Sequence, residues 1–102
     1  MITHVVLIRF PDPEAPSVEE LLAPFRELPG VILGLVSVEA GRNTNPEGLH
    51  QGFLHALIMR FSSAAARDAY LPHPAHVRIA TPLVASLTRG TGDVVVFDLE
   101  TN

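Results

Sequence analysis

The feature that most constrains this chain is a set of short segments that are apolar on both of their alternating faces. In residues 2–10, Val6 and Ile8 lie on one face, and Val5 and Leu7 lie on the other. A strand with this pattern is buried on both sides of its sheet. The chain has only 102 residues with which to cover both faces. We therefore expect part of the cover to come from outside the chain.

Four predicted strands alternate with two predicted helical regions. The strands are expected, in chain order, over residues 2–10, 31–40, 53–61 and 93–99. The order β-α-β-β-α-β predicts an α+β, ferredoxin-like fold, in which a four-stranded antiparallel sheet carries helices on one face only. The other face would then pair with the sheet of an identical chain. This arrangement is a dimeric α+β barrel, with a single domain over residues 1–102.

The first helical region is predicted from a capping signature. Ser17 and Glu20 have the spacing of a capping box, which favours a helix start at this point. Pro24 should kink the helix. Pro29 and Gly30 should end it.

The second helical region is predicted in two parts. Ser62 or Ser63 can cap a short helix that runs to about Leu71. Pro74 suits the first position of the next helix. That helix should run towards Gly90, which is the expected C-terminal cap.

Charge and composition exclude several classes of function. The net charge is −4 and the seven Lys and Arg residues are scattered, whereas nucleic-acid binding needs clustered positive charge. The absence of cysteine excludes disulfides, thiolate nucleophiles and Cys-ligated metal sites. No apolar run reaches the roughly 20 residues of a membrane-spanning helix, and we read no signal peptide. We therefore expect a cytoplasmic protein with no nucleic-acid or membrane partner.

Two histidines, His4 and His55, replace apolar residues in the predicted strands. If their faces point into the fold, both imidazoles meet an apolar cavity that could bind a small molecule. The predicted substrate-binding residues are His4, Val6, Ile8, Phe53, His55, Leu57 and His73. The alternative is that each strand histidine is a core residue bonded to a backbone carbonyl.

The segment 70–76 holds the densest group of proton-handling side chains. Tyr70, His73 and His76 recur every third residue, which would place them on one side of a continuous helix. Histidine exchanges protons near neutral pH because its unperturbed pKa is about 6.5. The alternative is that Tyr70 packs in the core and the His-Pro-Ala-His run caps the next helix. A metal site is less favoured, since the segment has no carboxylate or cysteine.

Five motifs together resemble a known family. They are His-Val-Val-Leu-Ile-Arg-Phe at 4–10, Leu-Pro-Gly-Val at 28–31, Gly-Phe-Leu-His-Ala-Leu at 52–57, Tyr-Leu-Pro-His-Pro-Ala-His-Val at 70–77 and Val-Val-Val-Phe-Asp at 94–98. Over nearly the whole chain, the sequence resembles the Dabb family of stress-responsive A/B barrel domains. The Tyr-x-x-His-Pro-x-His run is the most specific of the five.

The resemblance implies a homodimer with a cavity between the sheet and the helices of each chain. A plant member of the family, olivetolic acid cyclase, closes a linear polyketide by an aldol condensation without a cofactor. Tyr70 and His76 match its acid/base pair, and His4 and His55 match histidines of its pocket. By this resemblance, His76 would act as the base and Tyr70 as a hydrogen-bond donor.

Three functions remain open from the sequence. The first is a cofactor-independent cyclase or isomerase that acts on a poly-carbonyl or aromatic small molecule. The second is a non-catalytic, stress-associated dimer that binds a hydrophobic small molecule. The third is a cofactor-free monooxygenase of the same barrel architecture. No cofactor or metal is expected, and the following arginines are expected on solvated edges: Arg9, Arg60, Arg67, Arg78 and Arg89.

Overall fold

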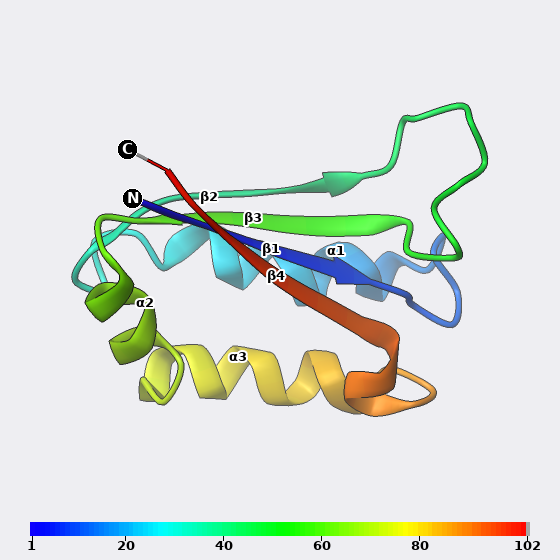
Figure 1. Cartoon of the computed structure of the whole chain (residues 1–102). Coiled ribbons are helices and arrows are strands. Elements are labelled where there is room, and N and C mark those ends of the chain that lie inside the picture. Colours follow the sequence, from blue (N-terminus) through cyan, green and yellow to red (C-terminus); the bar gives the residue numbers. More distant parts are fainter. Residues whose placement is uncertain (102) are drawn as a thin grey trace.

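A computed structural model describes residues 1–101 and contains one four-stranded sheet (Figure 1). The strands are β1 (Ile2–Ile8), β2 (Leu35–Arg42), β3 (His55–Phe61) and β4 (Val94–Glu100). They lie in the order β2-β3-β1-β4, and every neighbouring pair is antiparallel. The predicted ferredoxin-like α+β fold is therefore confirmed.

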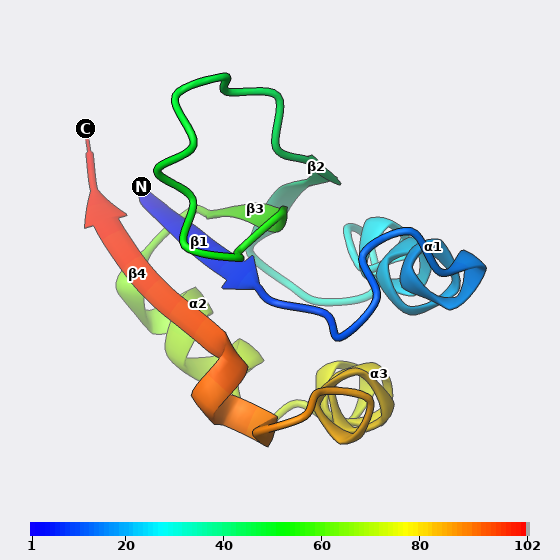
Figure 2. The ribbon, with the colours of Figure 1, turned by 90° about the vertical axis from the view of Figure 1, so that its right-hand side faces the viewer.

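The helices cover one face of this sheet (Figure 2). The helical elements are α1 (Pro16–Leu22), the 3-10 helix η1 (Ala23–Glu27), α2 (Ala64–Tyr70), α3 (Pro74–Ala85) and the 3-10 helix η2 (Gly90–Asp93). Fully buried side chains between the sheet and the helices include Ile8, Leu22, Leu57, Met59 and Phe61. The longest helix, α3, has 12 residues, and none of the helices in residues 1–101 has the length and apolar character needed to cross a bilayer.

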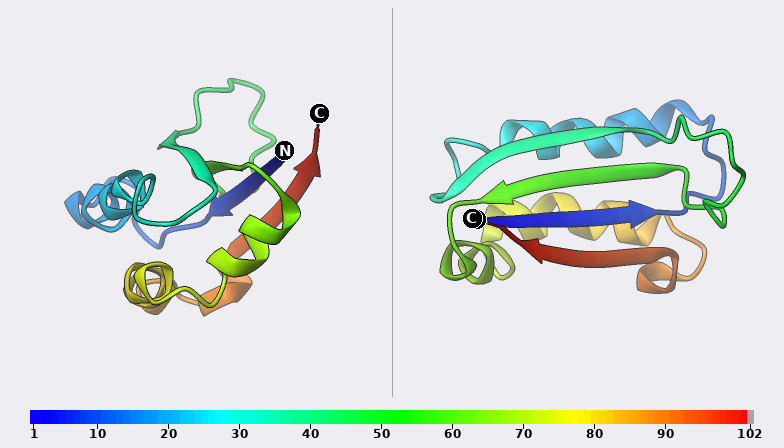
Figure 3. Two further views of the ribbon diagram at one scale, coloured as in Figure 1. Left: turned by 90° about the vertical axis from the view of Figure 1, so that its left-hand side faces the viewer. Right: turned by 45° about the horizontal axis from the view of Figure 1, so that its top comes forward.

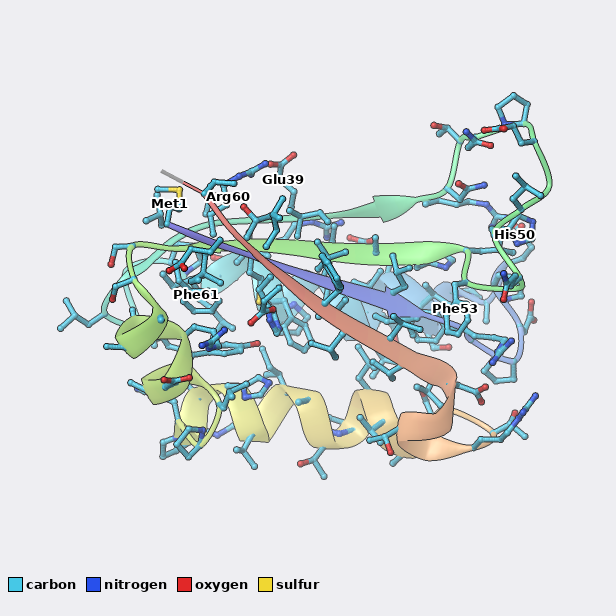
Figure 4. The ribbon with its side chains drawn as sticks, viewed as in Figure 1. Met1, Glu39, His50, Phe53, Arg60 and Phe61 are labelled. Carbon is cyan, nitrogen blue, oxygen red and sulfur yellow. The ribbon has the colours of Figure 1, made fainter. Side chains whose placement is uncertain are left out.

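The opposite face of the sheet carries no helix, as the right-hand view of Figure 3 shows. Its β4 side chains Val95, Phe97 and Leu99 are exposed, and Phe97 exposes 62% of its surface. In Figure 4, Glu39 and Arg60 lie on this open side, whereas Phe61 lies on the side of the helices. An apolar patch of this kind on a small chain marks an interaction surface.

The predicted start of the first helix is wrong. The helix begins at Pro16, its N-cap is Ala15, and no side chain caps it. Proline fits the first position of a helix because its missing N–H would have no partner there, so the capping box at Ser17 is not formed. Around Pro24 the helix changes from α to 3-10 geometry, which begins at Ala23.

The second helical region follows the prediction at its start and departs from it at its end. The Ser63 side chain accepts a hydrogen bond from the backbone N–H of Ala66, and Pro74 occupies the first turn of α3. However, α3 ends at Ala85, where the backbone N–H of Ser86 bonds to carbonyls of the last turn. Gly90, the predicted cap, begins η2 with φ +57°.

β2 and β3 start later than predicted, because turns precede them. Residues 31 and 32 both donate backbone hydrogen bonds to the carbonyl of Leu28, so the chain is still turning there. Gly34 then adopts φ +85°, and a Cβ at this position would lie only 2.5 Å from the Cβ of Ala66. β2 therefore begins at Leu35. Similarly, the backbone N–H of Phe53 donates to the carbonyl of His50 in a turn that delays β3.

Candidate active site

A cavity of about 250 Å³ lies between the sheet and α3. It is lined by Phe25, Met59, Leu71, Ala80, Leu83, Val84, Val94 and Val96, together with His4, Val6, Ile8, Leu57, Tyr70, His76 and Thr91. The lining contains no Lys, Arg, Asp or Glu. Its polar side chains are three proton-handling groups and one threonine, so the cavity combines an apolar wall with a small polar cluster.

Tyr70 and His76 face each other across the break between two helices. Tyr70 is the last residue of α2, and His76 lies in the first turn of α3. The turn between them brings the two rings to 4.0 Å between centroids, with 31° between their planes. Only 1% of Tyr70 is exposed. Burial raises the pKa of Tyr70, so its hydroxyl stays protonated at neutral pH and can donate a hydrogen bond.

The proton of His76 is fixed by a backbone hydrogen bond. Nδ1 of His76 lies 3.0 Å from the carbonyl oxygen of Leu71. A carbonyl can only accept, so Nδ1 carries the hydrogen and Nε2 of the neutral ring keeps its lone pair. Burial lowers the pKa of His76, although the hydrogen bond to Leu71 opposes this effect. His76 is therefore neutral at physiological pH and has the form of a general base.

His4 is a buried member of a partly buried hydrogen-bond network with Asp98 and Arg67. It is 5% exposed, and its Nδ1 lies 2.6 Å from Oδ1 of Asp98 on β4. Nη1 of Arg67 on α2 donates to Oδ2 of the same carboxylate at 2.5 Å. Burial alone would raise the pKa of Asp98, but the hydrogen bonds from Arg67 and His4 hold it below its ordinary value. The His4 ring meets the Tyr70 ring edge-on, 6.0 Å between centroids.

Asp98 and Arg67 are the site residues that the sequence interpretation missed. Arg67 was expected on a solvated edge, and this expectation is wrong, since its side chain is only 23% exposed and binds Asp98. The signal that could have identified Asp98 is the pairing of β1 with β4. β1 and β4 are antiparallel neighbours, and their register places Asp98 directly opposite His4.

The structure brings some of the predicted site residues together and separates others. Tyr70, His76, His4, Val6, Ile8 and Leu57 all line the cavity. Phe53, His55 and His73 do not. Cζ of Arg9 lies over the ring of Phe53, 4.3 Å from the ring centroid. Figure 4 shows Phe53 at the same end of the sheet as His50. Nδ1 of His73 accepts from the backbone N–H of Ala75 and so caps α3.

His55 lies at the opposite end of the sheet from Tyr70. It is 7% exposed and packs against Phe10, with 5.3 Å between ring centroids. Its buried Nδ1 has no hydrogen-bond partner within residues 1–101. Burial lowers the pKa of His55, and the nearby Arg42 adds to this effect. The folded protein therefore resists protonation of this imidazole.

We expect His55→Leu to change how stability depends on pH. An unfolded chain protonates histidine below a pKa of about 6.5, whereas folded His55 does not until a lower pH. As the pH falls from about 8 to about 5, the free energy of unfolding of the wild type should therefore decrease, and that of the variant should decrease less. Chemical denaturation at several pH values measures the difference. The exposed His50→Leu is the control, and parallel curves for wild type and His55→Leu would contradict the prediction.

Metal binding has no support from this geometry. Within the described part of the chain, no three His, Asp or Glu side chains converge as ligands would. The groups that do converge are Tyr70, His76 and His4, with Asp98 and Arg67 behind His4.

Comparison with known proteins identifies the family. Residues 2–101 match the family described as Stress responsive A/B Barrel Domain, or Dabb. The chain belongs to this family. This Dabb domain is 35% identical over 89 residues to the stress-response A/B barrel domain-containing protein HS1 of Arabidopsis thaliana, which covers 86% of this chain and 82% of that protein.

Solved structures resemble this Dabb domain closely. A dimeric ferredoxin-like protein of unknown function from Jannaschia sp. is 30% identical, with a TM-score of 0.87 and coverage of 98% of each chain. The hydroxynitrile lyase of Passiflora edulis has a TM-score of 0.83 and 19% identity, covering 99% of this chain and 93% of that one. At that identity, the likeness to the lyase shows the fold alone.

Proposed function

We propose that this Dabb domain is a cofactor-independent acid–base enzyme that acts on a small poly-carbonyl or aromatic compound. The reaction is an aldol-type cyclisation or an isomerisation, and His76 and Tyr70 are its catalytic residues. One observation carries the proposal. His76 has its Nδ1 proton bound to the carbonyl of Leu71, and its ring lies against Tyr70 in an apolar cavity. A neutral base beside a protonated phenol is what removal of a proton next to a carbonyl needs.

The mechanism begins with proton removal by His76. Nε2 of His76 takes a proton from a carbon next to a carbonyl group, and the substrate becomes an enolate. The Tyr70 hydroxyl donates a hydrogen bond to the enolate oxygen, where negative charge develops. In an apolar cavity such a donor is stronger than in water, because little solvent competes for the charge.

The cavity also selects the substrate. Its volume of about 250 Å³ is below the range of about 300–1,000 Å³ that is typical of ligand sites, so the compound is small. The lining contains no Lys, Arg, Asp or Glu, and any charge on His4 is matched by the carboxylate of Asp98. The cavity therefore favours a neutral compound over a phosphate or carboxylate. Val6, Ile8 and Leu57 would contact its carbon skeleton.

One solved structure and one sequence resemblance favour enzymatic function. One protein of the same fold is named a hydroxynitrile lyase, so this architecture supports catalysis. The sequence resemblance to olivetolic acid cyclase, in which Tyr70 and His76 match the acid/base pair, favours aldol chemistry in particular.

The open face of the sheet supports a homodimer as part of this proposal. Val95, Phe97 and Leu99 form an exposed apolar strip on β4, and the Jannaschia relative is described as dimeric. Pairing of two such faces would remove this surface from water.

The proposal is tested with the linear triketone diacetylacetone. Its intramolecular aldol closure and loss of one water give the phenol orcinol, which absorbance and chromatography detect. We expect the protein to accelerate orcinol formation without any added cofactor. Binding of the triketone without acceleration would refute the enzyme and support the small-molecule carrier. Consumption of dissolved oxygen during the reaction would instead support the monooxygenase.

A further inference from the structure

The two histidines of the cavity have different groups behind their rings. Nδ1 of His76 meets the uncharged carbonyl of Leu71. Nδ1 of His4 meets the carboxylate of Asp98 at 2.6 Å. A carboxylate behind an imidazole stabilises positive charge on the ring, and a backbone carbonyl does so much less. Neighbouring titratable groups in unlike surroundings are suited to opposite proton-transfer roles.

The charged groups around His4 come from two elements. Asp98 on β4 contacts His4 directly, and Arg67 on α2 binds the other oxygen of that carboxylate. Tyr70 on α2 lies at the edge of the ring, and His76 on α3 lies beyond Tyr70. Arg67 keeps Asp98 in its carboxylate form and fixes its orientation. Because Nδ1 of His4 is bonded to Asp98, Nε2 is the ring nitrogen that can contact a substrate in the cavity.

We propose that His4 is the general acid of this site and donates from Nε2, and that Asp98 and Arg67 are positioning residues that hold its ring through Nδ1. The proposal rests on the proposed function, since it assigns the second proton transfer of the same reaction. It gives His4 a catalytic role in addition to the binding role expected from the sequence.

With these two histidines, each proton transfer of the reaction has a donor and an acceptor. His76 takes the proton from carbon, the enolate carbon attacks a second carbonyl carbon, and the new carbon–carbon bond forms as that carbonyl becomes an alkoxide. Nε2 of His4 then gives its proton to the alkoxide oxygen, and His4 becomes neutral while Asp98 stays ionised. After product release, the proton on His76 is lost to solvent and His4 takes one from solvent.

The first test measures turnover of diacetylacetone by variants of the network. His4→Gln and Asp98→Asn should each lower turnover by about a hundredfold, within the range of general acid catalysis. Arg67→Lys keeps the cation and should retain more activity than Arg67→Gln. The control is Asp68→Asn, since Asp68 accepts from Nε of Arg67 but is exposed and does not contact His4. Wild-type turnover in His4→Gln would overturn the proposal.

The second test needs no substrate. In ¹⁵N-labelled protein, the imidazole of His4 should carry a proton on Nδ1, seen as a downfield resonance that Asp98→Asn removes or shifts. Asp68→Asn should leave this resonance unchanged. A wild-type spectrum in which Nδ1 of His4 carries no proton would overturn the positioning role.

The two proposals fail in different ways. If His76→Ala abolishes turnover and His4→Gln does not, the general acid is refuted and the proposed function stands. If the wild type does not convert the triketone, the proposed function and the general acid are both refuted, whatever the spectrum of His4 shows.

Discussion

Replacing His76 with alanine should lower turnover of diacetylacetone by about 10²–10⁴-fold, the range that general base catalysis contributes. His76 is the neutral imidazole of the cavity, with Nδ1 bound to the Leu71 carbonyl and Nε2 free to accept a proton. Steady-state formation of orcinol measures the effect. The circular dichroism spectrum should not change, because α3 keeps its cap at His73 and its first-turn Pro74.

Three further measurements make the test of His76 specific. His76→Gln keeps much of the side-chain volume without the base, and it should be as inactive as the alanine variant. Free imidazole in the buffer should restore part of the activity of His76→Ala, because it can enter the vacated space. His50→Ala is the control, since His50 lies in the exposed loop and its ring accepts from the backbone N–H of Gly52. Unchanged turnover in His76→Ala would remove the base from the mechanism.

Phe61→Ala should lower the free energy of unfolding by about 3–5 kcal/mol, the usual cost of truncating a buried phenylalanine. Phe61 is fully buried at the end of β3. Its ring centroid lies 5.0 Å from that of Tyr70 and 5.9 Å from that of His4. Its loss removes apolar burial and leaves a void beside two residues of the cavity. Denaturant unfolding at one fixed protein concentration measures the change.

The matched control for Phe61 is another large apolar side chain in a different environment. Leu33 is 95% exposed, so Leu33→Ala should change stability by no more than about 0.5 kcal/mol. A loss below about 1 kcal/mol in Phe61→Ala would contradict the prediction.

Local sequence signals predicted the order of the elements because each signal acts within a few residues. Ser63 and Pro74 define helix starts through their own side chains, and the structure has both. The errors arise where two local signals compete. Pro16 takes the first helical position before Ser17 can act as a cap. Gly34 must approach Ala66, which lies on α2 and is far from it in sequence, and no local pattern predicts such a contact.

The candidate site was only partly predictable for a similar reason. Tyr70 and His76 are close in sequence, and the Pro-His-Pro break between them turns one ring towards the other. Asp98 is 94 residues from His4, so their pairing depends on which strands are neighbours and in which register. His55 follows the same alternation as His4, but it lies at the far end of the antiparallel pair, opposite Ile8. Alternation predicts the face of a strand and gives no position along the sheet.

The position of His4 also limits how this chain can change length. His4 faces the cavity because β1 keeps a continuous register with both neighbours, opposite Met59 on β3 and Asp98 on β4. Inserting or deleting one residue before His4 within β1 would turn the imidazole to the open face and bring Thr3 or Val5 into its place. Insertions and deletions that preserve the chemistry are therefore confined to connections such as residues 43–54. The length of β1 before His4 cannot change.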